Sequence, residues 1–303
     1  MTQNTENSAP DTGEAARPIL VGVDGSDHAR HALNWAAAEA DRRTTTLTIV
    51  HALNLPATAA RPLEPVEYAH RRRTEGQAIL DQAAAAVRER HPDLPLTLEL
   101  SELDPTHTLV EFSREAALLV TGNRGHGGFT GMLLGSVSRK LAAHTDCPLV
   151  VVHEELPWDT ENRVVLGIGP KHSPAAARYA FEAARREGAA LTAVRAWIPN
   201  AMYTGRVGIG AMYTGHPEAD HRLAVEEAEA AIEPLRKEFP DVQVQITTYE
   251  GNAVEALIAT ADGARLVVIC AHRHRGPFSI GVGYCVEGTL AHSPTPVAVI
   301  PDH

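Results

Sequence analysis

Short apolar runs recur along the first half of the chain, each bounded by polar or turn-forming residues. Four are continuous runs of the kind that fill a fully buried strand, and the run that begins after Pro95 alternates apolar and polar positions. The pattern predicts five strands, at residues 19–23, 47–50, 96–100, 117–121 and 149–153.

Between these strands the apolar positions follow the spacing of a helix. Ser26 is typical of a helix N-cap, and the residues after it place Leu33, Ala36 and Ala40 on one apolar face. Strands that alternate with helices are joined by right-handed crossovers, so an α/β fold is expected, with a parallel sheet covered on both faces. Further helices are expected at residues 68–90, 106–114 and 136–144.

The second half of the chain repeats the pattern of the first. Residues 17–43 read RPILVGVDGSDHARHALNWAAAEADRR, and residues 162–186 read NRVVLGIGPKHSPAAARYAFEAARR. Three more segments match in the same order, so two tandem Rossmann-like domains are expected. The matching segments are 47–53 with 191–197, 117–129 with 265–278, and 141–152 with 289–300. The predicted divisions are a disordered tail at 1–16, domain 1 at 17–154, a linker at 155–161 and domain 2 at 162–303.

Composition narrows the class of protein. The chain has 303 residues, of which 44% are hydrophobic and 21% charged, as in an ordinary globular protein. Its formal net charge of −11 disfavours a nucleic-acid partner, and no apolar run reaches the roughly 18 residues of a membrane span. The start lacks the order of a signal peptide, and Cys147, Cys270 and Cys285 form no CxxC pair. A cytoplasmic location is therefore expected, with neither a disulfide framework nor a zinc site.

Residues 122–141, which follow the fourth expected strand, are rich in glycine. Residues 21–26, VGVDGS, run from the first strand into the first helix, so both segments should lie where parallel sheets bind ligands. Glycines let backbone N–H groups approach an anion, and the N-terminus of a helix near Ser136 adds positive charge. This indicates a phosphate site, although a glycine-rich stretch after a strand is also typical of a simple loop.

Two side chains are expected to complete such a site. The Ser136 hydroxyl would donate to phosphate oxygens while it caps its helix. Asp24 would accept ribose hydroxyls, or hold a hydrated Mg²⁺ between itself and the phosphates.

The spacing of the glycines is more specific than their number. Gly122, Gly125, Gly135 and Ser136 fit the pattern G-x2-G-x9-G-S, whereas the P-loop and dinucleotide patterns do not fit. Together with VGVDGS, HA at 51–52 and the closing run CPLVVV, this resembles the universal stress protein family, specifically its ATP-binding branch, present as two copies. The resemblance implies two five-stranded parallel sheets and a site for ATP. The residues that it implicates in domain 1 are Gly22, Asp24, Ala52, Gly122, Asn123, Arg124, Gly125, His126, Gly127, Gly128, Gly135, Ser136 and Val137.

The second half departs from the family pattern where the ligand is expected. Matching the segments by sequence places Ala271, His274 and Tyr284 where the first half has its two glycines and Ser136, and DGS at 24–26 becomes Gly-Pro-Lys at 169–171. Added Cβ atoms and a tyrosine ring should block a backbone cradle, so one strong site is expected, in domain 1. A rival interpretation is a basic site for another anion, formed by Lys171 with His272, Arg273, His274 and Arg275.

These features leave three hypotheses for function. The first is a nucleotide-dependent regulator in the stress response, with no catalytic residues. The second is a slow ATPase or nucleotidyl transferase, for which Asp24 and His126 are the available bases. The third is an interaction module that binds no nucleotide. The apolar fifth-strand edges, 149–152 and 297–300, predict either a homodimer or pairing of the two domains, and the AMYTG repeat at 201–215 predicts a lid or disorder.

Overall fold

A computed structural model describes seven stretches of the chain, at residues 17–55, 66–125, 133–154, 161–171, 173–199, 217–272 and 282–302. The expected tail, nearly all of the expected linker and the AMYTG repeat lie outside these residues. So do His126, Gly127, Gly128, Arg273, His274 and Arg275.

Domain 1 alternates strands with helices, as its hydrophobic pattern predicts. Every predicted strand and helix is present, with ends that differ by a few residues from those expected. The elements are β1 (Ile19–Gly22), α1 (Asp27–Arg42), β2 (Leu47–Ala52), α2 (Val66–Arg90), β3 (Leu96–Ser101), α3 (Pro105–Ser113), β4 (Leu118–Gly122), α4 (Ser136–His144) and β5 (Leu149–Val152).

Domain 2 repeats this order, which confirms the duplication. Its elements are β6 (Arg163–Gly167), α5 (Pro174–Glu187), β7 (Ala190–Trp197), α6 (Pro217–Glu238), β8 (Val244–Glu250), α7 (Ala253–Ala261), β9 (Leu266–His272), α8 (Tyr284–His292) and β10 (Val297–Asp302).

The strands form one ten-stranded sheet in the order β3-β2-β1-β4-β5-β10-β9-β6-β7-β8. Neighbouring strands within each domain are parallel, and only the central pair, β5 and β10, is antiparallel. This pairing joins Leu149 to Val299, Val150 to Ala298 and Val151 to Val297. The apolar edges that predicted association are therefore paired with each other inside one chain, which satisfies their backbone hydrogen bonds.

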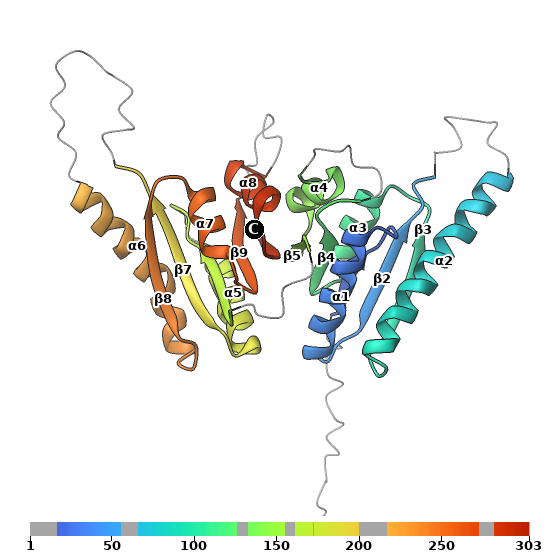
Figure 1. Ribbon diagram of the computed structural model, residues 1–303, viewed down its shortest axis with the longest axis horizontal. Coiled ribbons are helices and arrows are strands. Elements are labelled where there is room, and N and C mark those ends of the chain that lie inside the picture. The colour runs from blue at the N-terminus through green and yellow to red at the C-terminus, as the bar shows by residue number, and fades with distance from the viewer. Residues whose placement is uncertain are drawn as a thin grey trace, which may run out of the picture.

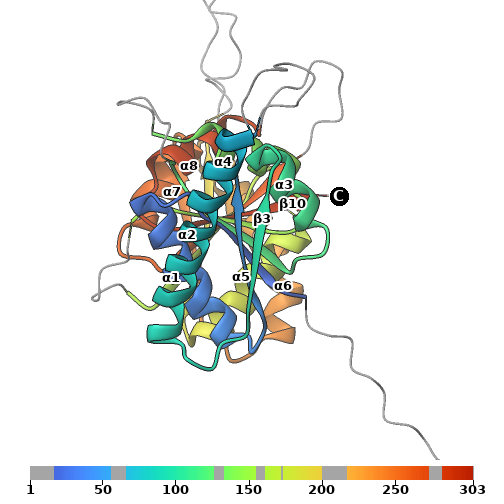
Figure 2. The same ribbon diagram turned by 90° about the vertical axis from the view of Figure 1, so that its right-hand side faces the viewer.

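Helices cover both faces of the sheet (Figures 1 and 2). One apolar core lies between the sheet and α1, α2, α5 and α6, and the other between the sheet and α3, α4, α7 and α8. Each core contains residues of both domains, so burial is continuous across the junction. At the junction α4 lies beside α8, and α1 lies beside α5 (Figure 1).

Local signals explain where the helices begin. Ser26 is the N-cap of α1, and its hydroxyl accepts a hydrogen bond from the Ala29 amide, as predicted. The N-cap of α4 is Gly135 and not Ser136, so the predicted capping role of Ser136 is wrong. Gly135 has the extended backbone of an N-cap, and Ser136 is already the first helical residue.

Within the part of the chain that the structure describes, no helix combines the length and the apolarity that a membrane crossing requires.

Candidate functional site

Three strands of domain 1 end at the same edge of the sheet with residues that the sequence singles out. β1 ends at Gly22, β2 at Ala52 and β4 at Gly122. β1 pairs with β2 on one side and with β4 on the other, so the chain changes direction between β1 and β4. Open α/β sheets bind ligands at this switch point, beyond the carboxyl ends of the strands. We call the ends of β1 and β4, with the N-terminus of α4, the glycine corner.

The glycines of this corner are required by close packing. A Cβ added at Gly122 would lie 2.8 Å from the backbone carbonyl carbon and oxygen of His28. A Cβ at Gly125 would collide with Oδ2 of Asp24, and one at Gly135 would lie 3.1 Å from the carbonyl oxygen of Asn123. The backbone at the end of β4 therefore runs directly against the backbone of α1 at Gly122, and against the Asp24 side chain at Gly125.

Hydrogen bonds hold the start of α4 against the end of β4. The Gly135 amide donates to the Asn123 carbonyl at 2.7 Å, and the Ser138 hydroxyl donates to the Gly122 carbonyl at 2.7 Å. No side chain caps α4 in the described structure, and its first turn has no acidic residue. In α1 the Ser26 side chain accepts from one of the first-turn amides, whereas in α4 no described side chain does so, and such amides are suited to binding an anion.

Asp24 lies across the corner from α4. Its Oδ1 accepts hydrogen bonds from the Ser26 amide at 3.0 Å and from the Ser26 hydroxyl at 2.6 Å. These bonds fix the half-buried carboxylate in the turn after β1, where Gly25 has a φ of +84°. Asp24 thus offers one carboxylate next to the glycine corner, in the place expected for a ribose or Mg²⁺ partner.

The remaining predicted residues lie on the same elements. Asn123 is 5% exposed, and within the described residues its Oδ1 has no hydrogen-bond partner, nor has the buried Nε of Arg124. Ser136 is exposed at the start of α4, whereas the Val137 side chain packs against the core on the α3 and α4 face. Buried polar atoms without partners are uncommon in folded proteins, and here two of them border the glycine corner.

Two histidines that the sequence did not mark as functional connect this corner to domain 2. The His28 Nδ1 donates to the His153 carbonyl at 3.1 Å, and the His153 Nε2 donates to the Leu290 carbonyl on α8 at 2.6 Å. Burial lowers the pKa of His153, and the nearby charge of His28 adds to this effect although the bond to Leu290 opposes it. His153 is therefore a neutral imidazole at the domain junction.

The equivalent corner of domain 2 differs from the sequence-based expectation. β4 pairs Leu119 with Leu149 of β5, and β9 pairs Val267 with Val297 of β10. Counting along the strands from these pairs places Cys270, and not Ala271, at the position of Gly122. The sequence match aligned TGNRG (121–125) with CAHRH (270–274), which is one residue away from the alignment that the strand pairing gives.

Two further substitutions lie where the sequence match places them, whereas His274 lies outside the described residues. Tyr284 begins α8 as Ser136 begins α4, and its ring is 74% exposed, with the hydroxyl accepting from the Asn252 side chain at 3.3 Å. Gly169 stands where domain 1 has Asp24 and supplies no carboxylate. Of the expected basic cluster, Lys171 and His272 are described, and His272 is bonded to Asp302.

Two cavities in the described structure lie away from the glycine corner. One of about 260 Å³ is lined by α1, α2 and the end of β5, and one of about 200 Å³ is lined by α1, α5 and Arg265 at the domain junction. Neither includes a residue that the sequence assigned to the nucleotide. A ligand at the glycine corner would therefore be held by backbone amides and not enclosed by either of these two cavities.

Fold and site together define a tandem α/β protein with a glycine-lined corner in its first domain. The chain belongs to the universal stress protein family, whose model matches residues 15–153 and 161–301. Universal stress protein Rv2623 of Mycobacterium tuberculosis is 29% identical over 298 residues, which cover 95% of this chain and 97% of the relative. Universal stress protein Rv2005c of the same organism is 30% identical over 293 residues, which cover 93% of this chain and 96% of the relative.

A solved structure shows the same fold over nearly the whole chain. The crystal structure of a universal stress protein from Archaeoglobus fulgidus matches with a TM-score of 0.68 at 16% identity, covering 95% of this chain and 97% of the other. At this identity the match supports the tandem architecture alone.

Proposed function

We propose that domain 1 binds ATP in the glycine corner and that the protein is a nucleotide-dependent regulator in the stress response. The observation that carries this proposal is the first turn of α4, which no described side chain caps. It is held over the end of β4 beside Gly122, where a Cβ would collide with the backbone of His28. Backbone amides at a helix N-terminus are suited to phosphate, and Asp24 is placed for a ribose or a hydrated Mg²⁺.

The proposed contacts come from three elements and their loops. The ends of β1 and β4 and the start of α4 surround the phosphates and ribose, and the backbone after β2 reads the adenine. The proposed residues are Gly22, Asp24, Ala52, Gly122, Asn123, Arg124, Gly125, Gly135, Ser136 and Val137, together with His126, Gly127 and Gly128. Domain 2 is proposed not to bind this ligand, because Cys270 and Gly169 replace a glycine and the carboxylate.

Regulation is proposed to use the contact between the two domains. The backbone of His28 packs against Gly122, and its ring is bonded to His153, which is bonded to Leu290 of domain 2. A nucleotide that moves the end of β4 therefore acts on a chain of contacts that reaches α8. We propose a protein partner, in the cytoplasm, that responds to this change, and the chain itself could also form a homodimer through surfaces other than β5 and β10.

A non-enzymatic role is proposed because the described part of the glycine corner supplies backbone groups for phosphate and one carboxylate, that of Asp24, which is held in a turn. The Asp24 Oδ1 accepts two hydrogen bonds from Ser26, which engage that oxygen in the turn. The alternative of a slow ATPase predicts measurable release of phosphate, and turnover well above about one per minute would favour it, since this exceeds an incidental rate.

Thermal unfolding with and without ATP tests the proposal. ATP at about 100 times its dissociation constant should stabilise the full-length protein by about 2.7 kcal/mol. Gly125→Ala, whose Cβ collides with Asp24, should lose most of this stabilisation. Gly169→Ala is the matched control in domain 2, because its Cβ would meet atoms at 3.7 and 3.9 Å, which is ordinary contact. An absent shift in the wild type, or an equal shift in Gly125→Ala, would contradict the proposal.

A further inference from the structure

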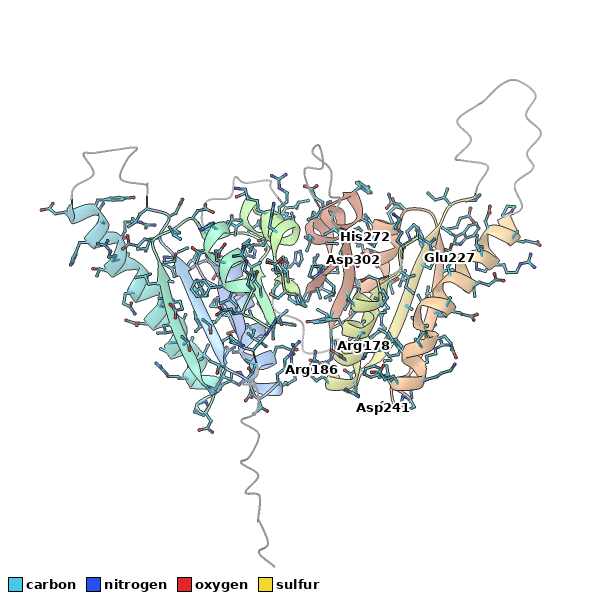
Figure 3. The ribbon with its side chains drawn as sticks, turned by 180° about the vertical axis from the view of Figure 1, so that it is seen from behind. Arg178, Arg186, Glu227, Asp241, His272 and Asp302 are labelled. Atoms are coloured by element: carbon cyan, nitrogen blue, oxygen red, sulfur yellow. The ribbon has the colours of Figure 1, made fainter. Side chains whose placement is uncertain are left out.

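Three side chains with different ligand atoms converge at the carboxyl ends of β9 and β10. Cys270 and His272 are two residues apart on β9, so they lie on the same face of the sheet. His272 pairs in register with Asp302 of β10. Its Nδ1 lies 2.9 Å from Asp302 Oδ2 and 3.8 Å from Cys270 Sγ, and one ligand atom from each residue lies within 4.8 Å of the other two. Figure 3 shows His272 and Asp302 side by side at the ends of their strands.

The arrangement differs from a catalytic Cys-His-Asp relay. In such a relay the acid and the nucleophile contact opposite nitrogens of the imidazole, so that a proton can pass from one side of the ring to the other. Here the carboxylate oxygen and the sulfur both lie near Nδ1 of His272. The three side chains therefore surround one point in space.

We propose that Cys270, His272 and Asp302 form a zinc site in domain 2, contrary to the expectation from the lack of a CxxC pair, because strand pairing brings together residues that are distant in sequence. Four-coordinate zinc places its sulfur, nitrogen and oxygen ligands roughly 3.3–3.6 Å apart. The distances from His272 Nδ1 to Asp302 Oδ2 (2.9 Å) and to Cys270 Sγ (3.8 Å) lie on either side of that range. Thiolate and imidazole are ligands for zinc and are poor ligands for Mg²⁺. Thiolate and carboxylate together balance the charge of the dication, and the fourth position remains for water or an external ligand.

A difference between the two domains explains why the Cys270 side chain fits at this position in domain 2. Cys270 occupies the position of Gly122, where the backbone of His28 would collide with a Cβ. In domain 2 the residue equivalent to His28 is Ser173, which is the N-cap of α5, so this helix begins later than α1. The Ser173 side chain hydrogen-bonds to Cys270, which is the kind of outer contact that orients a metal ligand.

The same strand positions in domain 1 cannot form this site. Arg124 and Glu154 of domain 1 stand where domain 2 has His272 and Asp302, and Gly122 stands in place of the cysteine. The proposed zinc site is therefore specific to domain 2, where Cys270 takes the position of a glycine. It does not depend on ATP binding, because every ligand belongs to domain 2.

Cobalt binding to the full-length protein tests the site. Co²⁺ should bind with one equivalent per chain and give a thiolate-to-cobalt charge-transfer band in the near ultraviolet, and zinc should abolish the band by displacement. Cys270→Ser should remove the band. Cys285→Ser, which alters the other half-buried cysteine of domain 2, is the matched control and should retain it. A wild-type complex without the band, or a band that survives in Cys270→Ser, would overturn the proposal.

Conservative substitutions of His272 and Asp302 test the proposed site without altering the cysteine. His272→Gln and Asp302→Asn should each weaken zinc binding by at least about tenfold, the lower end of what loss of a supporting group costs. Zinc should also slow alkylation of Cys270 in the wild type while leaving the rate at Cys285 unchanged. Equal zinc affinity in all variants, or equal protection of both cysteines, would show that the metal binds elsewhere.

Discussion

His153 shows how a single residue ties the proposed nucleotide site to the domain junction. Its Nε2 donates to Leu290, and among the described residues its buried Nδ1 has no hydrogen-bond partner. Protonation would add an N–H group at Nδ1 with no acceptor, next to the ring of His28. The cost of that proton agrees with the lowered pKa of His153 and links its charge to the stability of the fold.

The pKa of His153 predicts a loss of stability in mild acid. The folded-state pKa lies below the ordinary value of 6.5, so the stabilisation is complete above 6.5 and is lost as the pH falls toward the folded value. The unfolded chain binds the extra proton in this range, at up to about 1.4 kcal/mol per pH unit. His153→Gln should therefore show a shallower decline than the wild type when urea unfolding is measured from about pH 7.5 to about pH 5.5.

An exposed histidine provides the control for this prediction. His144, at the end of α4, is exposed, and its Nδ1 donates to the Lys140 carbonyl of its own helix. His144→Gln should leave the decline unchanged. Identical pH dependence in the wild type and His153→Gln would show that another group dominates the acid response.

At the scale of the element, two helix caps have the same role in stability but different roles at the proposed nucleotide site. Asp104 caps α3 by accepting from the Thr106 and His107 amides at 2.9 and 3.1 Å, on the exposed surface. Ser26 caps α1 and also donates to Asp24 in the glycine corner. The two side chains do the same work for their helices, but only Ser26 positions a residue of the proposed nucleotide site.

Alanine substitution should distinguish these two caps. Asp104→Ala and Ser26→Ala should each lower the free energy of unfolding by about 1 kcal/mol. Only Ser26→Ala should also weaken ATP binding, because it removes the hydroxyl bond that helps to hold the Asp24 carboxylate in its turn. Calorimetric titration with ATP beside urea unfolding measures both effects. Loss of affinity in Asp104→Ala as well would mean that the caps act on binding through general destabilisation.

The strands and helices of domain 1 were predictable because their signals are local. Period-two and helical spacings depend on neighbours in sequence, and the Ser26 cap needs only three residues. The predicted capping role of Ser136 was wrong because, in sequence, a serine at the first helical position cannot be told from an N-cap when its φ and ψ angles are unknown. The sequence match did not place Cys270 opposite Gly122, because it followed motif similarity. The correct alignment needs the strand register, which only pairing with β10 defines. The contact from His153 to Leu290 spans 137 residues and has no sequence signal.

At the scale of the whole molecule, the two repeats meet about an approximate twofold axis with opposite charges at equivalent positions. Arg42 and Glu187 are the last residues of α1 and α5 and lie 3.0 Å apart. Arg139 and Glu287 are the fourth residues of α4 and α8 and lie 3.8 Å apart. Two copies of domain 1 paired in this way would place arginine against arginine at both positions. The charges therefore favour pairing of the first repeat with the second.

A cluster of charged side chains from α1 and α5 also stabilises the pairing of the two domains. Glu39 of α1 is 3% exposed and is bonded to Arg42 and Arg43, and Arg186 of domain 2 lies 3.2 Å from it. Burial alone would raise the pKa of Glu39, but the arginine charges outweigh it and the pKa is lowered. Arg186 lies at the end of α5 that faces domain 1 (Figure 3). A buried carboxylate in domain 1 thus depends on a guanidinium from domain 2.

Reversing one charge of this cluster should weaken the junction. The side chain of Glu187 is 18% exposed and forms ion pairs with Arg42 and Arg265. Glu187→Arg breaks both pairs and places another positive charge next to Arg186. The loss of unfolding free energy should be about 2 kcal/mol, because a partly buried pair is broken and like charges replace it. Glu229→Arg, at an exposed position on α6, makes the same change in net charge and should alter stability by less than about 0.5 kcal/mol. Urea unfolding of both variants compares them directly, and equal losses would mean that net charge, and not the contact between α1 and α5, holds the two domains together.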